Sequence, residues 1–436
     1  MLKDNNIFFN KKILIYGLGK SGLSTYQYLK KQNTLYLFDD KNINFQNIEI
    51  KKRLIKYNKI SKNKFDRIII SPGIDLNKCK LSKYLKKNLS RVNTDLDIFY
   101  YFCPLNKNIT ITGTNGKSTT VKIIYNLLKD QKFDVRLVGN IGNPILLEKN
   151  ITKKTFFVIE ASSYQLEYSK LFKADFSAIL NISPDHLERH GKLKDYIKAK
   201  FKLVRNQRKK GVAFLNTKNP YINKEIKKGK IFCKVIKIKK NISLKNLKKI
   251  NNPYFITSGN IENLTFAFEI SKKLNLKKKL LYKTLSKFIG LKYRQQIIHK
   301  SKNLTIINDS KATSYSSSLS ILKSLPSVRW LVGGITKKGD KFLLSKKECI
   351  NFKAYIFGKY GKYFGKELKG KIDLEYFDTL KKALRKVFMD IDLKNNQNIN
   401  QTILFSPSAA SFDSFKNFEE RGKKFNILIK KMNLKK

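Results

Sequence analysis

Residues 108–119 read Asn-Ile-Thr-Ile-Thr-Gly-Thr-Asn-Gly-Lys-Ser-Thr and join an apolar run to a glycine-containing turn. The run at 108–112 predicts a buried strand, because it is short, largely β-branched and followed by glycine. The stretch at 119–128, after the turn, predicts a helix. A strand, a glycine-rich turn and a helix in this order predict a nucleotide-binding α/β domain.

The turn itself has the residues that a phosphate-binding loop needs. Gly113 and Gly116 let backbone N–H groups curve around phosphate oxygens, and the start of the helix adds partial positive charge. Lys117 can bridge the outer phosphates, and the hydroxyl of Ser118 or Thr119 can bind Mg²⁺. Counted from Gly113, the loop is shorter than the common Gly-x-x-x-x-Gly-Lys form. The turn therefore predicts an ATP site with an unusual spacing.

Two further apolar runs in this region end in polar residues. The strand predicted at 156–159 is followed by Glu160, and the strand predicted at 178–181 is followed by Asp185 and His186. The ends of parallel strands are the usual place for a site in an open α/β sheet. A carboxylate and an imidazole there could hold a second Mg²⁺. His186 could equally be a capping or packing residue, and the spacing does not decide between the two roles.

The N-terminal part of the chain predicts a β-α-β unit. A strand at 12–16 leads into the turn 17–22, which reads Gly-Leu-Gly-Lys-Ser-Gly, and a helix at 23–31 and a strand at 35–38 follow. Asp39 lies about twenty residues beyond the turn, as in a dinucleotide-binding fingerprint. The same turn could hold another diphosphate, and the spacing alone cannot choose between these ligands.

The C-terminal third predicts one more α/β domain. Its apolar runs at 304–309, 330–334, 354–358 and 402–406 alternate with spacers of helical length. The lysine-rich stretch 227–249, which precedes this third, predicts solvated edges and loops. The overall pattern predicts three α/β domains, at residues 1–93, 94–290 and 291–436.

The net charge of +60 comes from 92 Lys and Arg against 32 Asp and Glu. Such a charge invites a nucleic-acid interpretation. The lysines are spread along the whole chain, however, and Asn and Ile are abundant too. Because all three residue types have A/T-rich codons, a biased genome explains the composition. We therefore expect no specific nucleic-acid partner, although the charge should steer anionic substrates towards the protein.

No apolar run approaches the ~20 residues that a membrane-spanning helix needs. The N-terminus is polar and lacks the apolar core of a signal peptide, so the expected location is the cytoplasm. The four cysteines are far apart. They form neither a metal-binding spacing nor a disulfide framework.

Three segments of the sequence together resemble the Mur ligase family. They are residues 113–119, residues 308–313 (Asn-Asp-Ser-Lys-Ala-Thr) and residues 415–422 (Phe-Lys-Asn-Phe-Glu-Glu-Arg-Gly). The resemblance runs from about Gly17 to Gly422 in the same order. It implies three domains: a Rossmann-like N-terminal domain that binds a UDP-linked substrate, a central P-loop ATPase-type domain with a parallel or mixed sheet, and a Rossmann-like C-terminal domain for the incoming amino acid.

Within the family, the segments at 308–313 and 415–422 resemble the branch that adds D-glutamate. This implies ATP as cosubstrate, two Mg²⁺ sites, and UDP-N-acetylmuramoyl-L-alanine and D-glutamate as partners. It also implies an acyl phosphate and a tetrahedral intermediate on the way to the amide. A monomer is the expected state.

The resemblance implies roles for individual side chains. It places at the catalytic centre Lys117, Glu160, His186, Lys200 and Lys311. It places around ATP Gly113, Thr114, Asn115, Gly116, Lys117, Ser118, Thr119, Asn260, Asn263, Arg294 and Asp309. It places along the UDP-linked substrate Gly19, Ser21, Asp39, Lys41, Asn140, Ser162 and Gln165. It places around D-glutamate Thr313, Lys337, Ser411 and Phe418. It assigns to the metals Ser118, Glu160, His186 and, if carbamylated, Lys200.

The chain departs from the family pattern at three places. Gly259 stands where a histidine usually precedes the first asparagine, and Tyr293 stands where histidine is frequent. Lys41 replaces an arginine and cannot form its bidentate fork. For Lys200, the alternative is one more surface lysine. The competing functions are a Mur ligase with another amino-acid specificity, a dehydrogenase built on the turn at 17–22, and a polyanion-binding protein.

Overall fold

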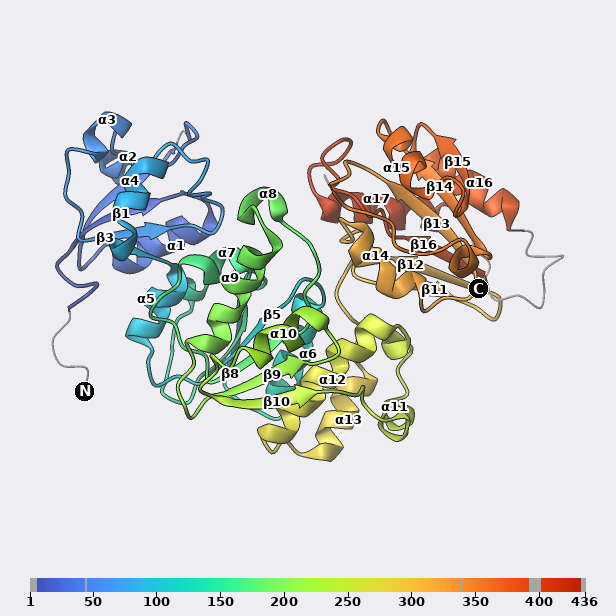
Figure 1. Ribbon diagram of the computed structural model, residues 1–436, viewed down its shortest axis with the longest axis horizontal. Helices are drawn as coiled ribbons and strands as arrows, with labels where there is room; N and C mark the ends of the chain where they lie inside the picture. The colour runs from blue at the N-terminus through green and yellow to red at the C-terminus, as the bar shows by residue number, and fades with distance from the viewer. Residues whose placement is uncertain (1–5, 44, 338, 392–400, 433–436) are drawn as a thin grey trace. The chain divides into compact units, whose positions relative to one another are not determined.

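The computed structural model describes residues 6–43, 45–337, 339–391 and 401–432 (Figure 1). Within these residues the strands form three sheets. The chain divides into two compact units. The first unit comprises Met1–Ile182, His186–Lys240 and Glu269–Leu276, and the second comprises Ser183–Asp185, Asn241–Phe268 and Lys277–Lys436.

The first sheet is parallel and has the strand order β2-β1-β3-β4. Its strands are β1 (Lys12–Tyr16), β2 (Thr34–Phe38), β3 (Arg67–Ile70) and β4 (Val92–Asn93). Its helices and turns are α1 (Lys20–Leu29), α2 (Ile48–Arg53), α3 (Tyr57–Ile60), α4 (Ser82–Lys87) and the 3₁₀ turn η1 (Leu89–Arg91). Apolar side chains from both faces of the sheet are buried, as expected for parallel strands covered on both sides.

The second sheet is also parallel and has the order β10-β9-β8-β5-β7-β6. Its strands are β5 (Asn108–Thr112), β6 (Val135–Gly139), β7 (Phe156–Glu160), β8 (Phe176–Ile179), β9 (Val212–Asn216) and β10 (Lys234–Ile238). Around it lie α5 (Asp95–Phe102), α6 (Lys117–Asp130), η2 (Ile145–Leu147), α7 (Ser163–Tyr168), α8 (Leu187–His190), α9 (Leu193–Arg205) and α10 (Pro220–Lys227). All five residues of β5 are buried, so the loop that follows β5 starts from the interior of the sheet.

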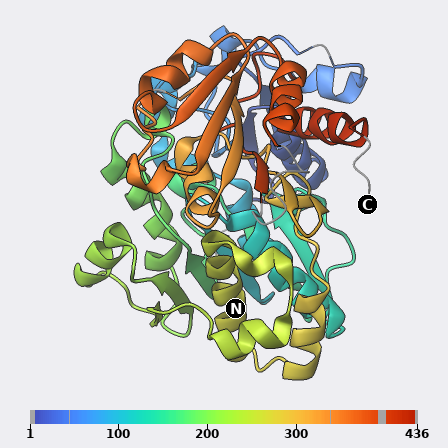
Figure 2. The same ribbon diagram turned by 90° about the vertical axis from the view of Figure 1, so that its right-hand side faces the viewer.

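The third sheet is mixed and has the order β11-β12-β16-β13-β14-β15, with β11 antiparallel to β12 and the other pairs parallel. Its strands are β11 (Gln296–Lys300), β12 (Leu304–Asn308), β13 (Val328–Gly333), β14 (Phe352–Phe357), β15 (Asp373–Phe377) and β16 (Gln401–Phe405). Its helices are α14 (Tyr315–Leu322), η4 (Lys347–Cys349), α15 (Gly361–Leu368), α16 (Leu380–Asp390) and α17 (Phe418–Lys430). Side chains of α14 and α15 pack in one apolar cluster and those of α16 and α17 in another, so helices cover both faces of the sheet (Figure 2).

Between the second and third sheets the chain forms α11 (Leu244–Ile250), η3 (Pro253–Ile256), α12 (Ser258–Lys273) and α13 (Lys278–Ser286). The lysine-rich stretch 227–249 is more regular than predicted, because it contains the edge strand β10 and most of α11. None of the helices in the described ranges is long and apolar enough to cross a bilayer. The α/β fold class is confirmed. Three sheets fit a three-domain layout, and the boundaries after residues 93 and 290 stay predictions.

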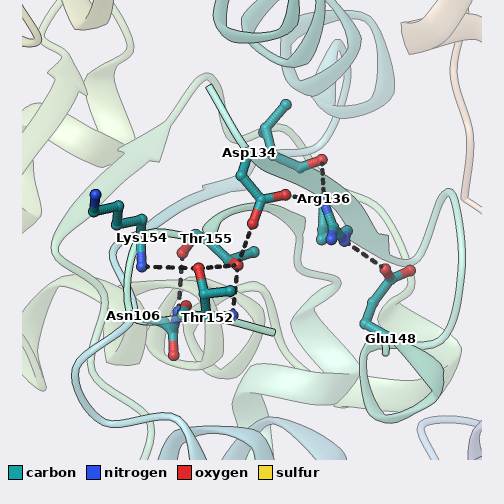
Figure 3. Close-up of polar contacts among 8 residues, drawn as sticks. Asn106, Asp134, Arg136, Glu148, Thr152, Lys154 and Thr155 are labelled. Atoms are coloured by element: carbon teal, nitrogen blue, oxygen red, sulfur yellow. Dashed lines mark hydrogen bonds and ion pairs between the residues drawn. The ribbon is translucent and has the colours of Figure 1, made fainter. Parts of the chain in front are cut away.

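A polar network fastens the amino end of the edge strand β6 (Figure 3). Asp134, just before the strand, accepts hydrogen bonds from Thr155 and Arg136. Thr155 Oγ1 accepts the backbone N–H of Thr152 at 2.9 Å, and Asn106 donates to the carbonyl oxygens of Thr152 and Thr155 at 2.7 and 3.0 Å. The network lies at the amino ends of the strands of this sheet. The candidate site lies at the opposite end, beyond the carboxyl ends of the strands.

Candidate functional site

The loop between β5 and α6 is held in shape by its own glycines and by the end of β8. Gly116 adopts a left-handed backbone (φ 83°) and is the N-cap of α6, a conformation that glycine adopts without strain. The N–H of Thr114 donates to the Asn181 carbonyl at 2.9 Å, and the N–H of Asn115 donates to Asn181 Oδ1 at 2.8 Å. The main chain of the loop is therefore fixed before any nucleotide arrives.

Lys117 folds back over this loop. Its Nζ donates to the carbonyl oxygens of Gly113 at 2.9 Å and Thr114 at 2.8 Å. The two carbonyls hold the ammonium group over the loop that leads into α6. A fixed cation at a helix N-terminus is a preorganised site for phosphate oxygens.

Behind the loop, Ser118 and Glu160 are in direct contact. Ser118 Oγ donates to Glu160 Oε2 at 2.6 Å, and Asn140 Nδ2 donates to Glu160 Oε1 at 2.8 Å. Glu160 is the last residue of β7 and is 1% exposed. β6 approaches closely here, since a Cβ on Gly139 would lie 2.3 Å from the Glu160 carbonyl oxygen. A hydroxyl and a carboxylate at this distance are the hard oxygen donors that Mg²⁺ prefers.

No group of three or more His, Cys, Asp or Glu side chains that could hold a metal is present among the described residues. Mg²⁺ in nucleotide sites keeps several waters and binds through one or two carboxylates plus substrate phosphates. Ser118 and Glu160 are two oxygen-bearing side chains that lie together beside the loop.

Lys200 reaches the loop from α9. It is 2% exposed, and its Nζ donates to the Gly113 carbonyl at 2.8 Å and contacts Thr112 Oγ1 at 3.4 Å. The ammonium lies 4.5 Å from the ring centroid of Tyr196, whose hydroxyl is 3.0 Å from Thr114 Oγ1. The alternative that Lys200 is a surface lysine is therefore wrong. Tyr196 was not predicted, although it precedes Lys200 by four residues and so shares its face of α9.

His186 is brought to the same aromatic group. It has a left-handed backbone (φ 55°) at the N-cap of α8, and its ring lies 5.1 Å from Tyr164 and 6.4 Å from Tyr196, measured between centroids. His190, at the other end of α8, was not predicted. Its Nε2 is 3.0 Å from Ser163 Oγ, and burial and neighbouring cations lower the pKa of His190 to about 4. His190 is therefore neutral at physiological pH.

The turn after β1 holds its acidic residue close to the main chain. The N–H groups of Leu18 and Lys41 donate to the two oxygens of Asp39 at 2.6 and 2.9 Å. Ser21 Oγ donates to Asp95 Oδ2 at 2.8 Å, and a Cβ on Gly19 would meet nothing within 4 Å. The open backbone at Gly19 leaves room for a phosphate group. Each Asp39 oxygen accepts one main-chain hydrogen bond and keeps a second lone pair for a ligand, so the turn does not distinguish a dinucleotide from another diphosphate.

Two more predicted substrate residues form a capping box at the start of α7. Ser162 Oγ accepts the N–H of Gln165 at 3.3 Å, and Gln165 Oε1 accepts the N–H of Ser162 at 3.1 Å. Ser162 therefore caps the helix and also fixes the Gln165 amide. Asp95 joins this group from α5 and was not predicted.

The predicted adenine-side residues lie in the second unit. Asn260 Nδ2 donates to the Tyr254 carbonyl at 2.9 Å, and the carbonyl of Arg294 accepts from the Tyr254 hydroxyl at 3.4 Å. Asp309 accepts the N–H of Gln295 and the hydroxyl of Ser406, both at 3.0 Å. Burial raises the pKa of Asp309 to about 7. Asn263 is buried on the same helix as Asn260.

The C-terminal motifs meet around Arg421, which is fully buried. Its guanidinium donates to the carbonyl oxygens of Ser310 and Ala409 at 2.8 and 2.9 Å, so it ties the segment 308–313 to the segment 406–411. Sequence reasoning placed Arg421 inside a motif without giving it a role. Asn308 Nδ2 donates to the Gly422 carbonyl at 2.9 Å. The segments 308–313, 406–411 and 415–422 are therefore joined by hydrogen bonds.

The side chains predicted to surround D-glutamate lie around these segments. Lys311 Nζ lies 4.1 Å from the ring centroid of Phe418. Lys337 Nζ donates to Asp185 Oδ1 at 2.8 Å. Ser411 is buried, and Thr313 is half-buried. The group therefore contains two lysines, one against an aromatic ring and one paired with a carboxylate.

Comparison with known proteins identifies two matching domain models. The Mur ligase MurD-like N-terminal domain matches residues 11–93, and the Mur ligase middle domain matches residues 111–281. Among curated relatives, the UDP-N-acetylmuramoylalanine–D-glutamate ligase of Rickettsia prowazekii is 34% identical over 98% of this chain and 99% of its own. The ligase of the same name from Buchnera aphidicola is also 34% identical, over 98% and 99%, and that from Rickettsia bellii is 32% identical, over 97% and 98%.

Solved structures support the fold. MurF ligase from Thermotoga maritima in complex with ADP gives a TM-score of 0.57 at 14% identity, over 98% of this chain and all of that one. The UDP-N-acetylmuramate-alanine ligase MurC from the same organism gives 0.54 at 15% identity, over 97% and 100%. At these identities the likeness concerns the fold and not the substrate.

Proposed function

The chain belongs to the Mur ligase family, and from this premise we propose that it joins D-glutamate to UDP-N-acetylmuramoyl-L-alanine, driven by ATP. The observation that carries the proposal is its similarity, over nearly the full length of both chains, to ligases named for this reaction. The loop at 113–118 supports it, because Lys117 folds back over the loop and Ser118 contacts Glu160, as the proposed roles of these residues require.

The chemistry requires an activated carboxylate, because a free carboxylate is a poor electrophile. An oxygen of the alanine carboxylate forms a bond to the γ-phosphorus, and the bond between that phosphorus and ADP breaks. The amine lone pair of D-glutamate then attacks the acyl carbon. The tetrahedral intermediate expels phosphate with the C–O bonding pair, and the nitrogen loses a proton as the amide forms.

The chain's cations serve the charges that build up in these steps. Lys117 and the N–H groups of the loop would stabilise negative charge on the β- and γ-phosphates. Lys311 and Lys337 would stand near the D-glutamate carboxylates and the reacting centre, with Thr313, Ser411 and Phe418 around them. Because phosphate, carboxylate and amino acid are all anionic, such cations lower the repulsion between the reactants.

We assign the metal ligands in the same manner. Ser118 and Glu160 would hold one Mg²⁺, and His186 with a carbamylated Lys200 would hold the second. When bound, Mg²⁺ neutralises charge on the phosphate oxygens. Carbamylation would convert the Lys200 amine into an anion. A Lys200→Ala variant should then lose most turnover and regain part of it with added bicarbonate, whereas a variant that stays fully active would refute the assignment.

The remaining contacts follow the family pattern. We propose that the adenine nucleotide is held by Asn260, Asn263, Arg294 and Asp309. We propose that the UDP-linked substrate is held by Gly19, Ser21, Asp39, Lys41, Asn140, Ser162 and Gln165. We further propose that the domain boundaries fall after residues 93 and 290.

The test is phosphate release by the purified full-length chain with ATP, Mg²⁺, UDP-N-acetylmuramoyl-L-alanine and one amino acid at a time. Release that requires D-glutamate is expected, and equal release with L-alanine or L-glutamate would refute the proposed specificity. A Lys117→Ala variant should lose about 100-fold or more in kcat, as when a preorganised charge stabiliser is removed. Lys129→Ala, at an exposed position of the same helix, is the matched control and should stay active.

A further inference from the structure

We propose that Asp95 is a positioning residue for the UDP-linked substrate. Its carboxyl joins Ser21, in the turn after β1, to Gln165, on α7, in one hydrogen-bonded group. This inference rests on the proposed function, because Ser21 and Gln165 are the residues assigned to two different parts of that substrate.

Asp95 lies in the part of the chain that connects the first sheet to the second. It is the first residue of α5, two residues after β4 ends, and it is 6% exposed. Its Oδ2 accepts from Ser21 Oγ at 2.8 Å, and its Oδ1 accepts the N–H of Leu96 at 2.9 Å. The Gln165 side chain is near enough to lower the pKa of Asp95 as a hydrogen-bonding neighbour. One carboxyl thus links a glycine-rich turn and a helix that are far apart in sequence.

The Gln165 amide is oriented by Ser162. Its Oε1 accepts from the N–H and from the hydroxyl of Ser162, each at 3.1 Å. The amide NH₂ is then the group of Gln165 that can donate to Asp95, since a glutamine offers two donors on nitrogen and acceptors on oxygen. Any change at Asp95 releases one end of Gln165 and one partner of Ser21 together.

The neighbouring carboxylate shows what a purely structural role looks like. Asp97 is fully buried on the same helix. Its Oδ1 accepts from the Ser169 hydroxyl and from three successive backbone N–H groups at 170–172. Its Oδ2 caps the helix at Thr94. Those partners belong to the main chain and to a loop, whereas the two side-chain partners of Asp95 are both assigned to the substrate.

Burial, and to a smaller extent the charge of Asp97, raises the pKa of Asp95. The Ser21 hydroxyl donates to this carboxyl, so Asp95 fixes the orientation of the Ser21 side chain. Asparagine, whose side-chain oxygen can accept the same hydrogen bond, should therefore replace Asp95 well.

The test measures binding of UDP-N-acetylmuramoyl-L-alanine to the full chain by calorimetry, together with KM values for all three substrates. Asp95→Ala should weaken binding of the UDP-linked substrate about tenfold, the size expected for one lost buried hydrogen bond. The KM for ATP should change less than about twofold, because the nucleotide loop keeps its contacts. Asp95→Asn should remain close to the unmodified chain.

Asp97→Asn is the matched control, since it should lower Tm without a selective change in the affinity for the UDP-linked substrate. Asp95→Ser replaces Asp95→Ala if the latter does not fold. A folded Asp95→Ala or Asp95→Ser variant with unaltered affinity for the UDP-linked substrate would refute the inference. So would a variant that weakens ATP and UDP-linked substrate equally. If instead the unmodified chain binds the UDP-linked substrate but does not use D-glutamate, the proposed function fails and the inference about Asp95 stands.

Discussion

At the level of single residues, His190 shows how one buried side chain makes the free energy of unfolding depend on pH. The imidazole has no exposed side-chain surface, contacts Ser163 through Nε2 and has Glu167 Oε2 3.9 Å from its Nδ1. Arg189 and Lys200 add positive charge nearby, so protonation is opposed by burial first and by these cations second. The residue joins α8, which carries His186 at its start, to α7, which carries Ser162 and Gln165.

The pKa of His190 falls from 6.5 in the unfolded chain to about 4 in the fold. The unfolded state therefore takes up a proton first as pH falls, and stability is full above 6.5 and declines towards 4. Between pH 7.5 and pH 5 this single group should remove about 2 kcal/mol of the free energy of unfolding.

Urea unfolding of the unmodified chain and of His190→Gln at both pH values measures that contribution. The variant should be less stable at pH 7.5, because it loses the Ser163 contact and some packing, but its stability should fall by about 2 kcal/mol less on acidification. All other ionisable groups are common to both proteins. Equal losses in the two proteins would contradict a neutral, buried His190.

Element scale: the network at the amino end of β6 (Figure 3) holds an edge strand without taking part in the site. Thr155 donates to Asp134, and this hydrogen bond is the main reason that the pKa of Asp134 is lowered. Thr155→Val keeps the shape of the side chain and removes the hydroxyl. We expect a loss of about 1–3 kcal/mol in unfolding free energy, because partners of a buried hydrogen bond are left unsatisfied.

The same variant should leave kcat and KM unchanged, since the loop at 113–118 lies at the opposite end of the strands. Urea unfolding and the phosphate-release assay give the two readouts. A large fall in kcat at unchanged stability would show that the edge strand influences the site, contrary to this account.

At the level of single elements, local sequence predicted buried strands well and edges poorly. Residues 12–16 and 108–112 form strands with the predicted bounds, and the strand predicted at 156–159 extends one residue further, to Glu160. The edge strand β10 was missed because the lysines at 234 and 237 interrupt its short apolar run and most of its residues are only partly buried or exposed. β8 ends two residues earlier than predicted, because Asn181 leaves the strand to hold Thr114 and Asn115.

The site was predictable where a motif contains its own residues, and much less so where contacts cross the chain. Lys117, Ser118 and Glu160 lie on or beside the ends of adjacent strands, where the sequence predicted them, and their roles stay predictions. Asp95 and Tyr196 carry no motif, and their roles come from side chains far away in sequence. Only the folded chain brings Asp95 to Ser21, 74 residues apart, and Tyr196 to Thr114, 82 residues apart.

For the molecule as a whole, the net charge of +60 bears on which ligands the protein attracts. We expect it to speed encounter with UDP-linked and nucleotide anions, without a specific nucleic-acid partner. Binding of a random-sequence DNA duplex at physiological salt should be weak, with Kd in the range of about 10⁻⁴–10⁻⁶ M that is typical of non-specific binding. Submicromolar binding at that salt would show that the charge has a polyanion-binding role of its own.

The central claim is that this chain forms the amide between UDP-N-acetylmuramoyl-L-alanine and D-glutamate. The most direct measurement offers the purified chain ATP, Mg²⁺, the UDP-linked substrate and an equal mixture of isotope-labelled D-glutamate and unlabelled L-glutamate, and then determines the mass of the product. We expect a product that carries one labelled glutamate and forms only with ATP. An unlabelled product, a mixture of both, or no ATP-dependent product would contradict it.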